Sequence, residues 1–114
     1  MNVPGGLVRQ TVMQSAAVAT GNGTAINTID VDGAFSVATM QVTGITTATI
    51  TFEVTNDGTN WVGILAENLT TGTEATTATA DGIYRVTVLG VRQLRARVSA
   101  WTSGTITVTG TVCT

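Results

Sequence analysis

The sequence predicts an all-β, single-domain β-sandwich, jelly-roll-like, with about 7–8 antiparallel strands and an N-terminal extended arm. Three observations predict this class. Apolar and polar side chains alternate with period 2 in several segments, and turn residues recur about every 8–12 positions. Threonine, whose branched side chain favours a pleated surface, occurs 25 times in 114 residues. We expect the arm over residues 1–20 and the sandwich over residues 21–114.

The N-terminal segment is the least regular part of the chain. A proline–glycine–glycine breaker stands at residues 4–6, and the apolar residues after it match neither a helix nor a strand cleanly. We expect an extended arm that becomes a strand only near its end. Soluble monomers rarely expose that much apolar surface, so the arm is expected to pack on another protein. The candidate contact residues are Leu7, Val8, Val12, Met13 and Val18.

The clearest strand spans residues 47–54, where Ala, Ile, Phe and Val fall on one face and Thr and Glu on the other. An Asn-Asp-Gly turn follows at residues 56–58, since Asn and Gly tolerate the positive φ that tight turns require. Trp61 then opens the partner strand, residues 61–66, and is expected to close the hairpin from the core.

Other strands flank this hairpin, separated by turns in which Gly, Asn and Asp recur. Two segments, 42–54 and 98–110, carry the same residue at five of thirteen positions. This echo indicates either shared hairpin chemistry or two equivalent halves of one fold. The further strands are expected at residues 25–31, 35–42, 83–89, 94–100 and 105–112, with turns at 43–46 and 102–104. Residues 67–80 are expected to form a polar surface loop, with a weak edge strand as the alternative.

The composition argues against several classes of protein. A net charge of −2 is unlike the basic field of a nucleic-acid binder. No apolar run is long enough to span a bilayer, and the N-terminus lacks the pattern of a signal peptide. The single Cys113 cannot form an internal disulfide. We therefore expect no nucleic-acid partner, no membrane span and no secretory signal.

The chain also offers little for catalysis. It contains no histidine, so it lacks the base of a Ser-His or Cys-His pair and the commonest metal ligand. Asp32, Asp57 and Asp81 each precede a glycine, and turn formation accounts for them. We expect no enzyme activity, no catalytic residue, no metal and no cofactor.

The arginines are concentrated in one region. Arg92, Arg95 and Arg97 lie within six residues, and Arg85 lies on the preceding predicted strand. They form either a solvated sheet face paired with acidic side chains, Glu53 or Glu67, or a contact surface. Arginine is favoured at interfaces because its planar fork binds carboxylates with two hydrogen bonds.

Trp101 has the opposite parity from the apolar residues of strand 94–100 and stands just before a turn. We therefore expect an exposed ring that marks a binding face, such as a platform on which a sugar stacks. Trp101 and the four arginines complete the candidate interface.

Three segments together resemble the capsid decoration (cement) and head-fibre proteins of tailed bacteriophages. They are Val-Thr-Gly at 42–44, Phe-Glu-Val-Thr-Asn-Asp-Gly-Thr-Asn-Trp at 52–61, and the segment 94–108 with its Leu-Arg-Ala-Arg and Ser-Gly-Thr-Ile-Thr-Val. The likeness covers about residues 25–112. It implies a structural virion protein that is made in the host cytoplasm, binds the outside of the capsid and cements neighbouring major capsid protein subunits, as a homotrimer. Carbohydrate-binding jelly rolls use similar Asp-Gly-x-x-Trp hairpins, so the alternative is a carbohydrate-binding module of a phage tail or host-facing surface.

Overall fold

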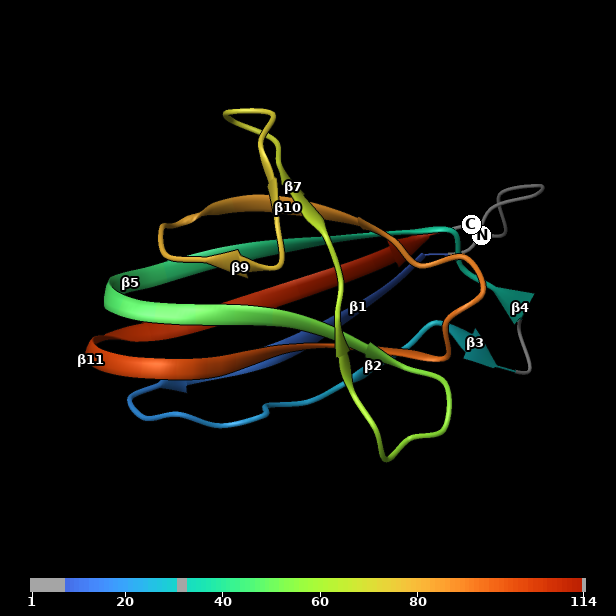
Figure 1. Cartoon of the computed structure of the whole chain (residues 1–114), viewed down its shortest axis with the longest axis horizontal. Coiled ribbons are helices and arrows are strands. Elements are labelled where there is room, and N and C mark those ends of the chain that lie inside the picture. The colour runs from blue at the N-terminus through green and yellow to red at the C-terminus, as the bar shows by residue number, and fades with distance from the viewer. Residues whose placement is uncertain (1–7, 31–32, 114) are drawn as a thin grey trace.

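The chain is built from β-strands joined by turns and loops (Figure 1). The structure is a computed structural model that describes residues 8–30 and 33–113. Among these residues there is no helix, and therefore none that could cross a membrane. The all-β, single-domain prediction is confirmed. The strands are β1 (Val8–Ala17), β2 (Ile26–Asn27), β3 (Ile29–Asp30), β4 (Gly33–Ala34), β5 (Val37–Thr55), β6 (Val62–Gly63), β7 (Ala66–Asn68), β8 (Glu74–Ala75), β9 (Thr77–Ala78), β10 (Gly82–Thr87) and β11 (Gln93–Cys113).

Two long strands, β5 and β11, organise the molecule. They pair antiparallel along almost their whole length, from Val37 beside Cys113 to Thr55 beside Gln93. The main sheet runs in the order β1-β11-β5-β10-β7-β8, while β2 adds to β11 and both β6 and β9 add to β5. Strands β3 and β4 form a separate two-stranded ladder. The two segments that echo each other in sequence are the central parts of the paired strands β5 and β11.

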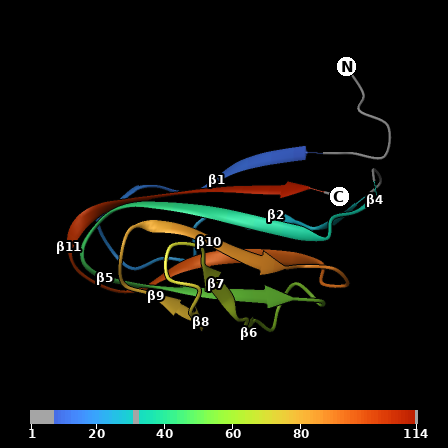
Figure 2. The same cartoon turned by 90° about the horizontal axis from the view of Figure 1, so that it is seen from above.

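The β5–β11 ribbon bends sharply near its middle, so the sheet folds back on itself into two layers (Figure 2). The bend contains Gly44, with φ 85°, and Gly104, with φ 119°. Glycine adopts these values without the clash that a Cβ would cause. The ladder shifts register around Gly104 but continues on the far side. The predicted turns at residues 43–46 and 102–104 are therefore wrong, because each lies inside one continuous strand.

The core fills the space between the two layers. In the layer with β10, Met40, Val86 and Val108 are buried, and in the other layer Ile50 and Phe52 are buried. The layers meet where the rings of Phe52 and Tyr84 lie with centroids 5.3 Å apart. The alternation predicted for residues 47–54 and 105–112 correctly identifies the buried faces of these parts of the long strands, and that for 94–100 is correct up to Val98 but wrong at Ala100, which is exposed.

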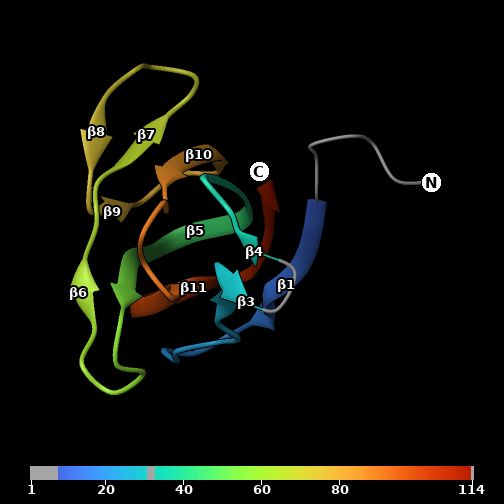
Figure 3. The ribbon, with the colours of Figure 1, turned by 90° about the vertical axis from the view of Figure 1, so that its right-hand side faces the viewer.

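The expected arm is instead part of the sandwich. Strand β1 pairs with the C-terminal half of β11, and Met13 is only 1% exposed within the core. The side-chain amide of Gln14 donates to the carbonyl oxygens of Ala96 (2.8 Å) and Gly21 (3.1 Å). The prediction of an arm over residues 1–20 is therefore wrong for the residues of β1, because β1 is an edge strand of the sandwich (Figure 3). Two register shifts in β1 break the period-2 pattern, which made this segment ambiguous in the sequence.

Candidate functional site

Arg95 and Arg97 of β11 converge on one carboxylate of β5, that of Glu53. The Nε atoms of Arg95 and Arg97 each lie 2.9 Å from Glu53 Oε1, and Arg97 Nη2 lies 3.1 Å from Oε2. Glu53 is 8% exposed. The hydrogen bonds from Arg97 hold the pKa of Glu53 below its usual value, although burial alone would raise it. Glu53 in turn raises the pKa of Arg97.

Trp61, which belongs to the predicted hairpin, lies against this cluster of Glu53, Arg95 and Arg97. β6 pairs with β5 as expected, but Trp61 is only half-buried, so its predicted place in the core is wrong. The Arg95 guanidinium lies over the Trp61 ring, 4.1 Å from its centroid, in a cation–π contact on the outer side of the layer. Asp57 fixes the turn by accepting hydrogen bonds from the backbone of Thr59 and Asn60. The Asn60 side chain and these backbone N–H groups lower the pKa of Asp57.

The four arginines do not form one cluster. β10 pairs with β5 and β7, not with β11, so Arg85 is separated from Arg95 and Arg97. Arg85 instead forms an ion pair with Glu67 at 2.6 Å, with both side chains well exposed. Arg92 is exposed beside the 56–58 turn, where its backbone N–H binds Asn56 Oδ1 at 3.1 Å. Of the two interpretations of the arginines, the sheet face paired with acidic side chains therefore fits Arg85, Arg95 and Arg97.

Replacing Glu53 with glutamine is expected to lower the free energy of unfolding by roughly 1–3 kcal/mol. The substitution leaves the partly buried guanidinium groups of Arg95 and Arg97 without their counter-charge. Glu67→Gln is the matched control, because the Arg85–Glu67 pair is exposed and is worth about 0–1 kcal/mol. Urea denaturation of both variants measures the difference. Equal losses in the free energy of unfolding would show that the Glu53 cluster stabilises the fold no more than the exposed Arg85–Glu67 pair does.

The apolar interface candidates divide into exposed and buried residues. Val8, Val12 and Val18 are exposed, at 74%, 52% and 58%. Met13 is a core residue, so its assignment to the interface is wrong. Leu7 lies outside the described residues. The structure therefore leaves three of the five apolar candidates accessible.

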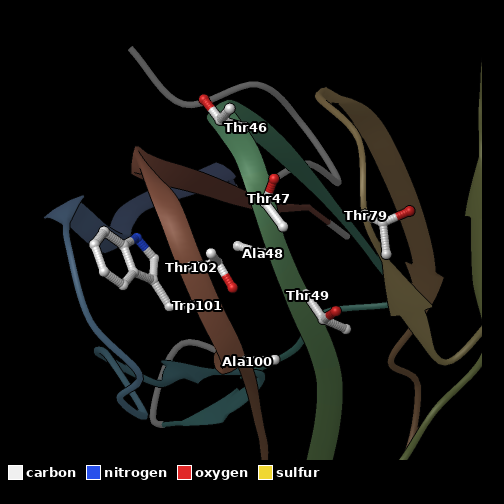
Figure 4. Close-up of a pocket in the computed structure, with 8 residues that line it drawn as sticks. All are labelled: Thr46, Thr47, Ala48, Thr49, Thr79, Ala100, Trp101 and Thr102. Atoms are coloured by element: carbon white, nitrogen blue, oxygen red, sulfur yellow. The ribbon is translucent and has the colours of Figure 1, made fainter.

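A groove of about 270 Å³ lies at the bend of β5 and β11 (Figure 4). β5 contributes one wall, β11 the other, and Thr79 lies at the side after β9. None of the lining residues is charged. The sequence offered no signal for this groove, because its threonines looked like ordinary strand and turn residues. The lining residues are Thr46, Thr47, Ala48, Thr49, Thr79, Ala100, Trp101 and Thr102.

Trp101 borders this groove but does not stand free above it. A register shift between Val98 and Ala100 reverses the alternation, so Trp101 pairs with the buried Ala48 and packs against the core. Its indole Nε1–H donates to the Gly104 carbonyl oxygen at 3.1 Å. Figure 4 shows the ring on the side of β11 away from Thr79. The predicted fully exposed platform is therefore wrong, and Trp101 is half-buried.

Metal ligands do not gather in the described residues, where no group of three or more His, Cys, Asp or Glu side chains could hold an ion. The lining of the groove offers threonine hydroxyls and small apolar side chains, without a charge. Such surfaces bind by shape and by neutral hydrogen bonding.

Comparison with solved structures finds this fold in other proteins, among them two of phage or exported origin by their descriptions. The SPBc2 prophage-derived protein YomS matches with a TM-score of 0.83 and 17% sequence identity, over 100% of this chain and 99% of YomS. The PBSX exported protein XepA matches with a TM-score of 0.89 and 17% identity, over 100% of this chain and 40% of XepA. At these identities the likeness shows a common fold. A scan of protein-family models and a search of curated protein sequences found no match.

Proposed function

We propose that this protein is a non-enzymatic structural component of a bacteriophage particle, which binds the outside of the capsid as a homotrimer and cements neighbouring major capsid subunits. The observation that carries the proposal is the fold shared, along the entire chain, with a protein described as prophage-derived. The sequence resemblance to phage decoration proteins supports the same class. A cement protein binds only the assembled shell, and therefore stabilises the shell by mass action.

The outer face of the β1–β11–β5–β10 layer is the surface that we assign to capsid contact. β1 is the end strand of the sheet, and Val8 and Val12 are exposed on it. In the ladder, Val12 lies beside Thr109, and Ile83 of β10, also exposed, lies in the same row across β5. Thr109 of β11 and Gln41 of β5, both uncharged, lie between Val12 and Ile83 in this row. The charged pair Arg85–Glu67 lies at the β10 side of this face, while the part formed by β1, β11 and β5 around Val12 can exclude water on contact with little cost for desolvating charges.

Purified protein is expected to bind undecorated capsids of the encoding phage saturably and to raise the temperature at which the shell disrupts. Val12→Asp places a charge in the assigned face, and should weaken binding by at least about tenfold. Val62→Asp is the control, because Val62 is also exposed but lies on β6 in the other layer. Co-sedimentation and thermal scanning give both readouts. Absence of capsid binding by the unaltered protein, or an equal effect of the two variants, would contradict the assignment.

A further inference from the structure

The groove at the bend of β5 and β11 offers hydroxyl groups that the protein itself does not use. Some threonine hydroxyls elsewhere bond within the chain: Thr51 Oγ1 donates to Ser99 Oγ at 2.7 Å, and Thr55 Oγ1 to Asp57 at 3.0 Å. Within the described residues, the five threonine hydroxyls that line the groove make no such bond. They therefore remain available to a ligand.

We propose that this groove binds a neutral saccharide. Each threonine hydroxyl can donate and accept a hydrogen bond, which matches the hydroxyl groups of a sugar. The threonine methyl groups, together with Ala100, supply apolar contacts for the C–H faces of a sugar ring. The lining carries no charge, which favours an uncharged ligand over an anion or a cation. A volume of about 270 Å³ suits one or two sugar residues better than a long chain.

The walls of the groove are held by the fold, so little ordering is required when a ligand binds. Ser99 Oγ donates to the Thr49 carbonyl oxygen at 3.3 Å, across the register shift of β11. On the other side of the groove, the indole N–H of Trp101 donates a hydrogen bond to the Gly104 carbonyl oxygen, which fixes the position of the ring. Trp101 thus supports the wall rather than stacking on the sugar. Without a stacking aromatic ring, we expect a dissociation constant in the range of about 1–10 mM for a single sugar.

The position of the groove is compatible with the proposed attachment to a capsid. Thr49 and Ala100 form a cross-strand pair on the outside of their layer, since the neighbouring Ala48 and Ile50 point into the core. Val8 and Val12 lie on the opposite outer face of the sandwich. A particle-bound protein could therefore present the groove outward, where many copies would raise a weak affinity by avidity.

Nuclear magnetic resonance titration of the isolated protein tests this proposal with methyl glycosides of glucose, galactose, rhamnose and N-acetylglucosamine. We expect at least one glycoside to shift the amide signals of residues 46–49, 79 and 100–102 selectively. Thr49→Val with Thr102→Val removes two hydroxyls while keeping the β-branched shape, and should weaken binding about tenfold. Thr109→Val makes the same change on the opposite outer face and should leave binding unchanged.

Two outcomes would overturn the saccharide site. One is the absence of a selective shift with any of the four glycosides up to about 50 mM, well above the expected dissociation constant. The other is binding that the double variant leaves intact while its thermal unfolding is normal. Because the titration uses isolated protein, its result is independent of capsid binding.

Discussion

Gly44→Ala is expected to lower the free energy of unfolding by roughly 3–5 kcal/mol, a large share of the roughly 5–15 kcal/mol that holds a domain of this size together. Gly44 has φ 85°, and a Cβ built there would overlap the carbonyl oxygen of Thr105. The overlapping atom belongs to the backbone of the neighbouring strand, so a rotamer change cannot relieve the clash. The variant should unfold at a much lower temperature or fail to fold.

Gly90→Ala separates the two causes of this effect. Gly90 has φ 95°, but a Cβ there would meet nothing within 4 Å. It should therefore show only the cost of the positive φ, about 1–2 kcal/mol. Thermal unfolding monitored by circular dichroism measures both variants. Similar losses for Gly44→Ala and Gly90→Ala would show that close packing at the bend does not matter.

The bend connects the two layers of the sandwich, because β5 and β11 both pass through it. Besides the glycines, Asp81 stabilises it, since its carboxylate accepts hydrogen bonds from the backbone N–H groups of Gly44 (3.2 Å) and Ile45 (2.9 Å). Asp81 therefore does more than form the turn that the sequence indicated. The proposed saccharide groove lies beside the same bend, and a variant that straightens the ribbon would remove the groove as well.

Deleting residues 1–20 is expected to prevent formation of a stable monomer. The deletion removes β1, with the buried Met13 and the hydrogen bonds of Gln14, and it exposes the edge of β11. Burial of Met13 alone is worth about 1.5–3 kcal/mol, and an uncovered long edge promotes aggregation. Expression, size-exclusion chromatography and thermal unfolding should show aggregated or unfolded protein.

Val12→Ser is the control for this deletion, because Val12 lies on the same strand with its side chain exposed. The substitution should change the free energy of unfolding by less than about 0.5 kcal/mol. A truncated protein that unfolds cooperatively, at a temperature close to that of the full chain, would show that β1 is dispensable.

Sequence alone determined the class of the fold and most of its core. Period-2 alternation over residues 47–54 and 105–112 identified the face of each strand that points into the core, because successive residues of a strand point to opposite faces. The Asn-Asp-Gly turn and the pairing of β5 with β6 across it also followed from local residues. These features depend on neighbours in the chain, so local pattern was enough to find them.

How the strands continue, and what they surround, depends on contacts between segments that are distant in the chain. Glycine at positive φ can end a strand or bend it, and the residues near Gly44 and Gly104 are compatible with both. Pairing along the whole of β5 and β11 selects the bend. One register shift likewise reverses the side to which Trp101 points, and β1 finds its partner about a hundred residues away in β11. Local sequence does not encode these choices, because each is settled by the packing of segments that are distant in the chain.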